Sequence, residues 1–260
     1  MRLKIAAILD YYFPRKADVL LALEVAQMPD QRLIEDKLTV ATATPLTPVS
    51  GQQGIGRRVW TAGEGNFVAR YEATVDVTRQ PFDLARLKAA PLRELPGRVI
   101  HYLWPSRYTQ ADAIETFASE QFEGLDGGAA IAAMAEWTRA NLSYTPGCSD
   151  ASTTAHDTFH QKRGICRDFA HVLLALARSR DIPARMVSAY AWDLSPPDFH
   201  AVVEVYLQGG WYLVDPSGLA PAEGLVRIAI GRDATDISFM TVFGGVARIN
   251  SQSVSVERLD

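Results

Sequence analysis

The sequence predicts an α+β protein with a β-rich first part, a helix-rich middle part and further strands at the end. Before about residue 80, short apolar runs are broken by Pro, Gly, Asp and Asn, as is typical of successive strands. From about residue 109 to 181, apolar residues recur at helical spacing instead. After Pro183 the alternation typical of strands returns, with a clear hairpin pattern over residues 200–216.

The first part reads as an N-terminal β-sandwich-like domain. Its strand candidates are 2–13, 18–26, 32–43, 56–63 and 67–78, and the segment GEGN at 63–66 is typical of a hairpin turn. The Pro-rich, charged stretch 81–98 is the best linker candidate. We therefore expect a β-rich domain with linker at 1–98 and a second domain at 99–260 that includes the C-terminal strands.

The second part begins with helices and ends with strands. The spacing predicts helices over 109–124, 127–147, 149–164 and from Cys166 to about Asp181, where Pro183 stops the last one. Strands are expected at 184–192, in the hairpin over 200–216, and at 225–231 and 253–259.

Composition narrows the classes of function. The chain has 260 residues, a net charge of −4 and two cysteines. This charge offers no electrostatic basis for binding nucleic acid or an anionic membrane. No apolar run reaches 18 residues, and the run Ile5–Leu9 is too short for a signal peptide, so we expect a cytoplasmic protein with free thiols.

The stretch RGICRDFAHVLLALARS places Cys166 at the start of a predicted amphipathic helix. A helix N-terminus carries unpaired N–H groups and a partial positive charge, which favour a thiolate and can hold an oxyanion. Gly164 is expected to allow an unusual backbone angle and close approach of a substrate. Asp168, in the first turn, is expected to cap the helix. A buried structural cysteine is the alternative for Cys166, and the expected reading for Cys148.

A cysteine nucleophile needs a histidine base and an acceptor that orients it. His200 begins the hairpin and Asp215 ends it. If the loop is Gln208–Gly209, Leu207 pairs with Gly210, and Asp215 becomes the diagonal neighbour of His200 on one sheet face, roughly 7–8 Å away between backbones. A slip of one residue would place the two on opposite faces. Periodicity alone does not bring Cys166 to His200.

Three blocks together resemble the transglutaminase-like superfamily: GICRDFA (164–170), IPARMVSAY (182–190) and HAVVEVYLQGGWYLVDPSG (200–218). The resemblance covers about residues 100–245. It implies a papain-like/transglutaminase-like core with the catalytic Cys at a helix N-terminus packed on an antiparallel sheet. It also implies Cys166 as nucleophile, His200 as general base and acid, and Asp215 as the residue that orients the imidazole. Val202 departs from the family, in which many members carry Trp at that position, and this puts the shape of the cleft in doubt.

The resemblance implies a cysteine-dependent acyl-transfer enzyme similar to the bacterial transglutaminase-like cysteine proteases. Such an enzyme acts on amide bonds of a peptide or protein substrate through a thioester intermediate. We expect a peptidase or amidohydrolase. The alternatives are a protein-glutamine γ-glutamyltransferase, which cross-links proteins, and a non-catalytic peptide-binding module with the same fold. Oligomeric state is left open.

Metal binding is the sharpest rival hypothesis. His156 and His160 are spaced i, i+4, which places both on one helix face, and Cys148 could in principle join them. The motif is H-D-T-F-H rather than H-E-x-x-H, and no CxxC pair accompanies it. We therefore expect neither a metal centre nor a cofactor.

Overall fold

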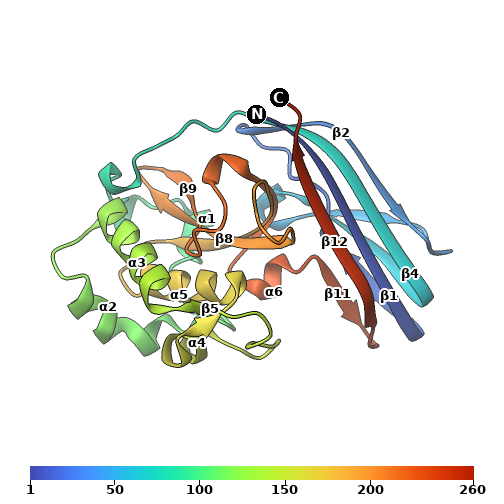
Figure 1. Cartoon of the computed structure of the whole chain (residues 1–260). Coiled ribbons are helices and arrows are strands. Elements are labelled where there is room, and N and C mark those ends of the chain that lie inside the picture. Colours follow the sequence, from blue (N-terminus) through green and yellow to red (C-terminus); the bar gives the residue numbers. More distant parts are fainter.

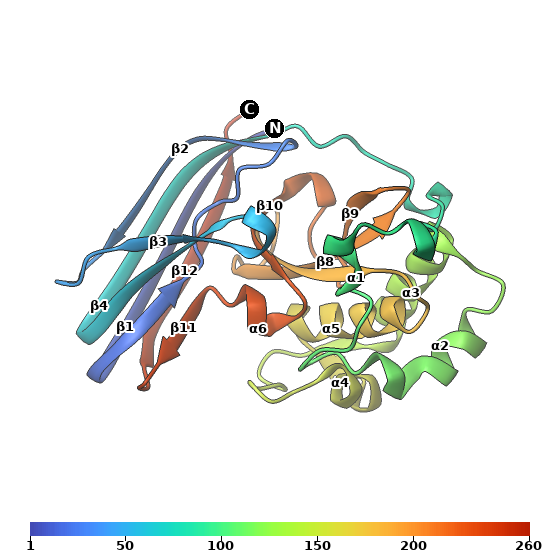
Figure 2. The same cartoon turned by 180° about the vertical axis from the view of Figure 1, so that it is seen from behind.

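A computed structural model describes all residues, 1–260, and has two antiparallel sheets of several strands, one in each part of the molecule (Figure 1). The larger sheet has the order β11–β1–β4–β2, with β12 also paired to β1 and β3 to β4. The smaller has the order β10–β7–β8–β9 and is flanked by helices. Figure 2 shows the same two parts from behind. The larger sheet consists of β1 (Arg2–Leu21), β2 (Gln31–Val40), β3 (Thr47–Ser50), β4 (Arg57–Val77), β11 (Met240–Phe243) and β12 (Arg248–Arg258).

The larger sheet buries one face, as its sequence alternation predicts. Along β1, the side chains of Leu3, Ile5, Ala7 and Leu9 are almost fully buried, while their neighbours are more exposed. The buried face packs on residues of the smaller sheet, where Tyr71 stacks on Tyr190 with ring centroids 6.1 Å apart. The second layer of this sandwich-like arrangement is therefore the smaller sheet.

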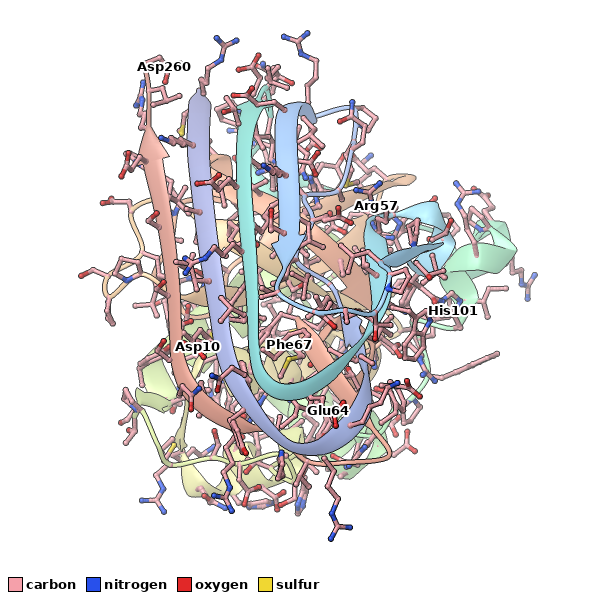
Figure 3. All side chains as sticks on the ribbon, turned by 90° about the vertical axis from the view of Figure 1, so that its right-hand side faces the viewer. Asp10, Arg57, Glu64, Phe67, His101 and Asp260 are labelled. Carbon is pink, nitrogen blue, oxygen red and sulfur yellow. The ribbon has the colours of Figure 1, made fainter.

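The predicted hairpin turn at 63–66 is wrong, because β4 continues through it. Figure 3 shows β1 and β4 bending together near Glu64. The register between them shifts between Phe13 and Ala17, where Pro14 can sit because a bulge needs no ladder hydrogen bond from it. A Cβ on Gly63 would lie 2.7 Å from the ring of Phe13, so glycine here makes room for a bend rather than for a chain reversal.

The C-terminal strands, which were expected to belong with residues 99–260, complete the larger sheet. β12 pairs with β1 from Leu3↔Arg258 to Tyr12↔Arg248, and β11 pairs with the other end of β1. Both chain ends consequently lie side by side at one end of this sheet (Figure 1). The larger sheet is thus built from residues at both ends of the chain, and no single boundary separates it from the rest.

The segment 81–98, which was predicted as a linker, packs against the part of the molecule that contains the smaller sheet and its helices. It contains two short 3-10 helices (Leu84–Arg86 and Leu92–Glu94) followed by α1 (Gly97–Ile100). Ala89 forms an isolated bridge with Leu207, and the N–H of Gly128 donates to the carbonyl of Leu87 at 2.8 Å. A Cβ on Gly128 would lie 1.8 Å from the carbonyl oxygen of Leu84, so this glycine permits the close contact.

Helices cover one face of the smaller sheet, and α5 packs directly on β7 and β8. Its apolar stripe, which includes Phe169, Leu173 and Ala177, meets Ala201 and Val203 in one buried cluster. The helices are α2 (Glu115–Gln121), α3 (Gly127–Asn141), α4 (Ala155–Gln161), α5 (Cys166–Arg178) and α6 (Ala234–Ile237). The strands are β7 (Ala184–Ala191), β8 (Phe199–Leu207), β9 (Gly210–Val214) and β10 (Leu225–Gly231), with a parallel pair β5 (Ser143–Tyr144) and β6 (Arg163–Gly164) before α5.

The predicted register of the β8–β9 hairpin is confirmed. Leu207 pairs with Gly210 and Val203 with Val214. Gln208 and Gly209 both have positive φ, 49° and 83°, as a two-residue type I′ turn requires. This register carries His200 and Asp215 to the same end of the hairpin. None of the helices combines the length and the apolar character needed to cross a bilayer.

Candidate active site

Cys166 is the first residue of α5, after the extended residue Ile165. The first N–H groups of a helix have no acceptor within the helix and are free for other partners. Asp168 is fully buried and caps this end, since its Oδ2 accepts from the N–H of Ile165 at 2.9 Å. Gly164 has a different role from the one expected: a Cβ there would lie 2.6 Å from Cβ of Asp168, so the missing side chain makes room for the cap rather than for a substrate.

His200 and Asp215 form a buried pair at the end of the β8–β9 hairpin. Nε2 of His200 lies 2.9 Å from Oδ2 of Asp215, and the two side chains are 1% and 5% exposed. The diagonal relation predicted from the hairpin is thus a direct contact. With Nε2 committed to the carboxylate, Nδ1 is the nitrogen left for the thiol of Cys166.

The carboxylate of Asp215 is held in place by four further donors. Oδ1 accepts from the N–H and the hydroxyl of Ser217 at 2.9 and 2.6 Å, and Oδ2 accepts from the N–H groups of Leu219 and Ala220, both at 3.1 Å. Burial opposes ionisation, but the bonds from His200 and Ser217 outweigh it and hold the pKa of Asp215 below its usual value. The loop after β9 therefore presents a fixed, ionised acceptor to the imidazole.

His200 is poised to hold a proton. Burial alone would lower its pKa, but the hydrogen bond to Asp215, followed by the interaction with the thiol of Cys166, raises the pKa of His200 to about 9. A protonated imidazole between a carboxylate and a sulfur atom stabilises a thiolate at that sulfur. The three side chains, from a helix start, a strand start and a strand end, are thereby brought together at one point.

Tyr144 is a fourth member of this site, which the sequence did not reveal. It lies on β5, where it pairs with Gly164 of β6, two residues before Cys166. Burial, and then the charge of the neighbouring Cys166, raise the pKa of Tyr144 to about 12, and its hydroxyl also interacts with the backbone N–H of Cys166. A neutral phenol at this position has an O–H that can donate to an oxyanion or to the sulfur of Cys166. The only signal in the sequence was an aromatic residue before a Pro-Gly turn.

The other sequence candidates make no hydrogen bond to Cys166, His200 or Asp215. Nε2 of His156 lies 3.1 Å from Nε2 of His160 on the exposed face of α4, and Cys148 is a partly buried free thiol in the loop before it. No three His, Cys, Asp or Glu side chains in the chain are grouped as metal ligands. Val202 is fully buried in an apolar cluster with Val187 and Ala189, on the same face of β8 as His200, so its difference from the usual Trp alters packing on that face.

Comparison with known proteins places this site in a family. A family model of the transglutaminase-like superfamily matches residues 112–216, a range that contains Cys166, His200 and Asp215. A solved structure from Cytophaga hutchinsonii, named "Putative Cysteine Protease", superposes with a TM-score of 0.95 at 33% identity, over 100% of this chain and 91% of that one. This chain belongs to the transglutaminase-like superfamily, and its fold and site support a cysteine-type enzyme.

Two other proteins are similar over less of this chain or at lower sequence identity. An uncharacterized protein of Mycobacterium leprae is 36% identical over 117 residues, which cover 42% of this chain and 42% of that relative. The periplasmic domain of TgpA from Pseudomonas aeruginosa matches 84% of this chain and 91% of its own length, at 15% identity and a TM-score of 0.42.

Proposed function

We propose that this chain is a cysteine-dependent acyl-transfer enzyme that acts on amide bonds of a peptide or protein through a thioester. Cys166 is the nucleophile, His200 the general base and acid, and Asp215 the residue that orients the imidazole. The observation that carries the proposal is the buried His200–Asp215 pair, 2.9 Å apart, with the Cys166 thiol against the same imidazole. A histidine with a purely structural role seldom contacts both a carboxylate and a thiol, whereas a histidine that activates a cysteine nucleophile needs both.

The first half-reaction follows from these positions. The thiolate Sγ of Cys166 attacks the carbonyl carbon, and the carbonyl π electrons move onto oxygen. The N–H of Cys166 and the hydroxyl of Tyr144 donate to that oxyanion. The imidazolium of His200 then gives its proton to the amide nitrogen as the C–N bond breaks, which releases an amine and leaves a thioester on Cys166.

The second half-reaction regenerates the thiol. Neutral His200 takes a proton from the incoming nucleophile, which attacks the thioester carbonyl while the same two donors hold the oxyanion. Collapse breaks the C–S bond, and the proton held by His200 returns to the leaving sulfur or remains in the ion pair. Water as nucleophile gives a carboxylic acid, so the enzyme is a peptidase or amidohydrolase. The name carried by the Cytophaga hutchinsonii structure supports this choice.

Turnover of a labelled protein tests the proposal. Wild type is incubated with fluorescein-labelled casein, alone and with a fluorescent primary amine, beside Cys166→Ala and the matched control Cys148→Ala. We expect peptide release by wild type and Cys148→Ala, and none by Cys166→Ala. Incorporation of the amine into casein without peptide release would replace hydrolysis by amine transfer. If Cys166→Ala equals wild type in both readouts, the thiol is not the nucleophile.

A further inference from the structure

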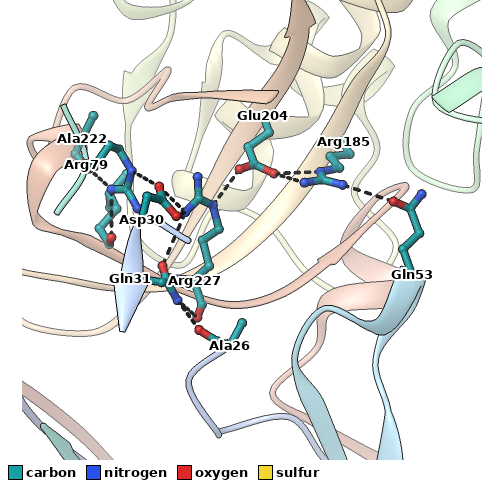
Figure 4. Close-up of polar contacts among 10 residues, drawn as sticks. Ala26, Asp30, Gln31, Gln53, Arg79, Arg185, Glu204, Ala222 and Arg227 are labelled. Carbon is teal, nitrogen blue, oxygen red and sulfur yellow. Dashed lines mark hydrogen bonds and ion pairs between the residues drawn. The ribbon is translucent and has the colours of Figure 1, made fainter. Parts of the chain in front are cut away.

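A ladder of five charged side chains connects the two sheets (Figure 4). The charged ladder consists of Arg79, Asp30, Arg227, Glu204 and Arg185. Nε of Arg79 and Nη1 of Arg227 each lie 2.8 Å from Oδ2 of Asp30. Nε of Arg227 lies 2.6 Å from Oε1 of Glu204, and Nε of Arg185 lies 2.7 Å from Oε2. Most of the ladder is buried: the side chains of Glu204, Arg185 and Arg227 are 0%, 2% and 5% exposed.

The ladder has a net charge of +1, because it consists of three guanidinium groups and two carboxylates. Both oxygens of Asp30 and both oxygens of Glu204 are already engaged by arginine. A buried excess charge is costly unless something pairs with it. Nη2 of Arg227 makes no hydrogen bond within the protein, and Nη1 of Arg185 makes only a long one, 3.4 Å, to Oε1 of Gln53. The buried guanidinium nitrogen of the ladder that has no partner is Nη2 of Arg79, which does not line the cavity described next.

The guanidinium groups of Arg185 and Arg227 border a cavity of about 490 Å³. A third arginine, Arg98 of α1, joins Arg185 and Arg227 in its lining. The carboxylates of Asp30 and Glu204, both paired with arginines of the ladder, also line the cavity, and its apolar residues include Trp211, Met28 and Ile55. The guanidinium carbon of Arg185 lies 4.1 Å from the ring centroid of Trp211, a stacking contact that fixes the plane of its donors.

We propose that this cavity is a binding site for a small molecule with an oxyanion group, either a carboxylate or a phosphate. Guanidinium groups present forked N–H donors that fit both anions, and the site offers such donors from separate elements, α1, β7 and β10. The anion supplies the charge that the ladder lacks, and the apolar wall takes the body of the ligand. The ligand thereby bridges the segment before β2 and the smaller sheet.

The site is separate from the one that contains Cys166, and the proposal does not depend on the proposed function. None of Cys166, His200 and Asp215 lines the cavity. Glu204 lies four residues beyond His200 along β8, which is roughly 13 Å of strand. Binding is therefore measured as affinity and thermal stability rather than as turnover.

Titration of the intact protein with simple anions tests the proposal. Sodium phosphate and sodium acetate are titrated separately by calorimetry and in thermal unfolding, with sodium chloride adjusted to keep ionic strength constant. Arg98→Ala is the test variant, because its side chain is exposed and outside the ladder. Arg93→Ala, an exposed arginine on the neighbouring 3-10 helix that does not line the cavity, is the matched control.

We expect at least one anion to bind wild type and to raise its Tm, and the Arg98→Ala variant to bind about tenfold more weakly, because one charge-assisted hydrogen bond is lost. The Arg93→Ala variant should bind as wild type does. Binding of phosphate alone or of acetate alone identifies which oxyanion the site prefers, and either result supports the proposal. Absence of binding by both, or equal weakening in Arg98→Ala and Arg93→Ala, overturns it.

Discussion

Replacement of Asp215 by Asn tests whether the buried carboxylate activates the thiol. In wild type the pKa of His200 is raised from 6.5 to about 9, chiefly by Asp215 against the effect of burial. This difference of about 2.5 in pKa corresponds to about 3 kcal/mol of preference for the imidazolium. Asn keeps the shape of the side chain but removes its charge, so the variant should lose much of that preference.

Because the carboxylate raises the pKa of His200, its removal should slow alkylation of Cys166. Below about pH 9, His200 of the wild type keeps its proton and can pair with a thiolate at Cys166. In the Asp215→Asn variant, burial still lowers the pKa of His200 and only the thiol of Cys166 still raises it, so the imidazolium and its ion pair with the thiolate are less favoured at pH 7. We expect alkylation of Cys166 by iodoacetamide at pH 7 to slow by about 10- to 100-fold, the equivalent of about 1.4 to 2.7 kcal/mol.

Mass spectrometry of both cysteine-containing peptides measures this rate. Cys148 lies in the same chain and serves as the internal reference, and circular dichroism checks that the variant is folded. Alkylation of Cys166 in Asp215→Asn at the wild-type rate across pH 6 to 8 would refute the reasoning, because the carboxylate would then have no influence on the thiol.

Three further changes probe the oxyanion donors, the charged ladder and the shared sheet. Tyr144→Phe should slow acylation by p-nitrophenyl acetate about 100-fold and change alkylation by iodoacetamide much less, since only acylation forms an oxyanion; equal effects on both rates would contradict the assignment. Glu204→Gln should lower the free energy of unfolding by about 3–5 kcal/mol in urea titrations, because Arg185 and Arg227 are left buried without their shared carboxylate; a loss below 1 kcal/mol would contradict it. Deletion of residues 248–260 should lower Tm and promote association in size-exclusion chromatography, because it exposes an edge of β1; an unchanged elution profile and Tm would show that β12 is dispensable.

Short-range interactions made the elements around Cys166, His200 and Asp215 predictable from the sequence. The apolar stripe after Cys166, the Gln208–Gly209 turn and the alternation along β8 each have a short-range physical cause, so the sequence predicted α5 and the hairpin register. The transglutaminase-like assignment followed from the order of these blocks. The direct contact between His200 and Asp215 followed from that register, because a two-residue turn fixes which residues face one another.

Long-range pairing made the remainder unpredictable. β12 joins β1 across more than 230 residues of chain, and its alternation says only that it is a strand, not which edge it joins. Gly63 and Gly65 resemble turn residues, but the reason for glycine at 63 is the ring of Phe13, a partner from another strand. Tyr144 likewise lies beside Cys166 only because β5 and β6 pair in parallel. This pairing involves two residues of each strand, which is too short to give a periodic pattern in the sequence.

The strand β8 carries both the imidazole of the candidate active site and the shared carboxylate of the charged ladder. His200 and Glu204 lie on the same face of β8, one bonded to Asp215 and the other to Arg185 and Arg227. A slip of one residue along β8 would move both side chains to the face that packs on α5, where neither would find its partner. The type I′ turn at Gln208–Gly209 and the apolar residues Ala201, Val203 and Val205 oppose that slip. The ladder adds a third restraint, since Glu204 can reach both arginines only in the observed register. The buried charges that connect the two sheets therefore also help to fix the position of the imidazole.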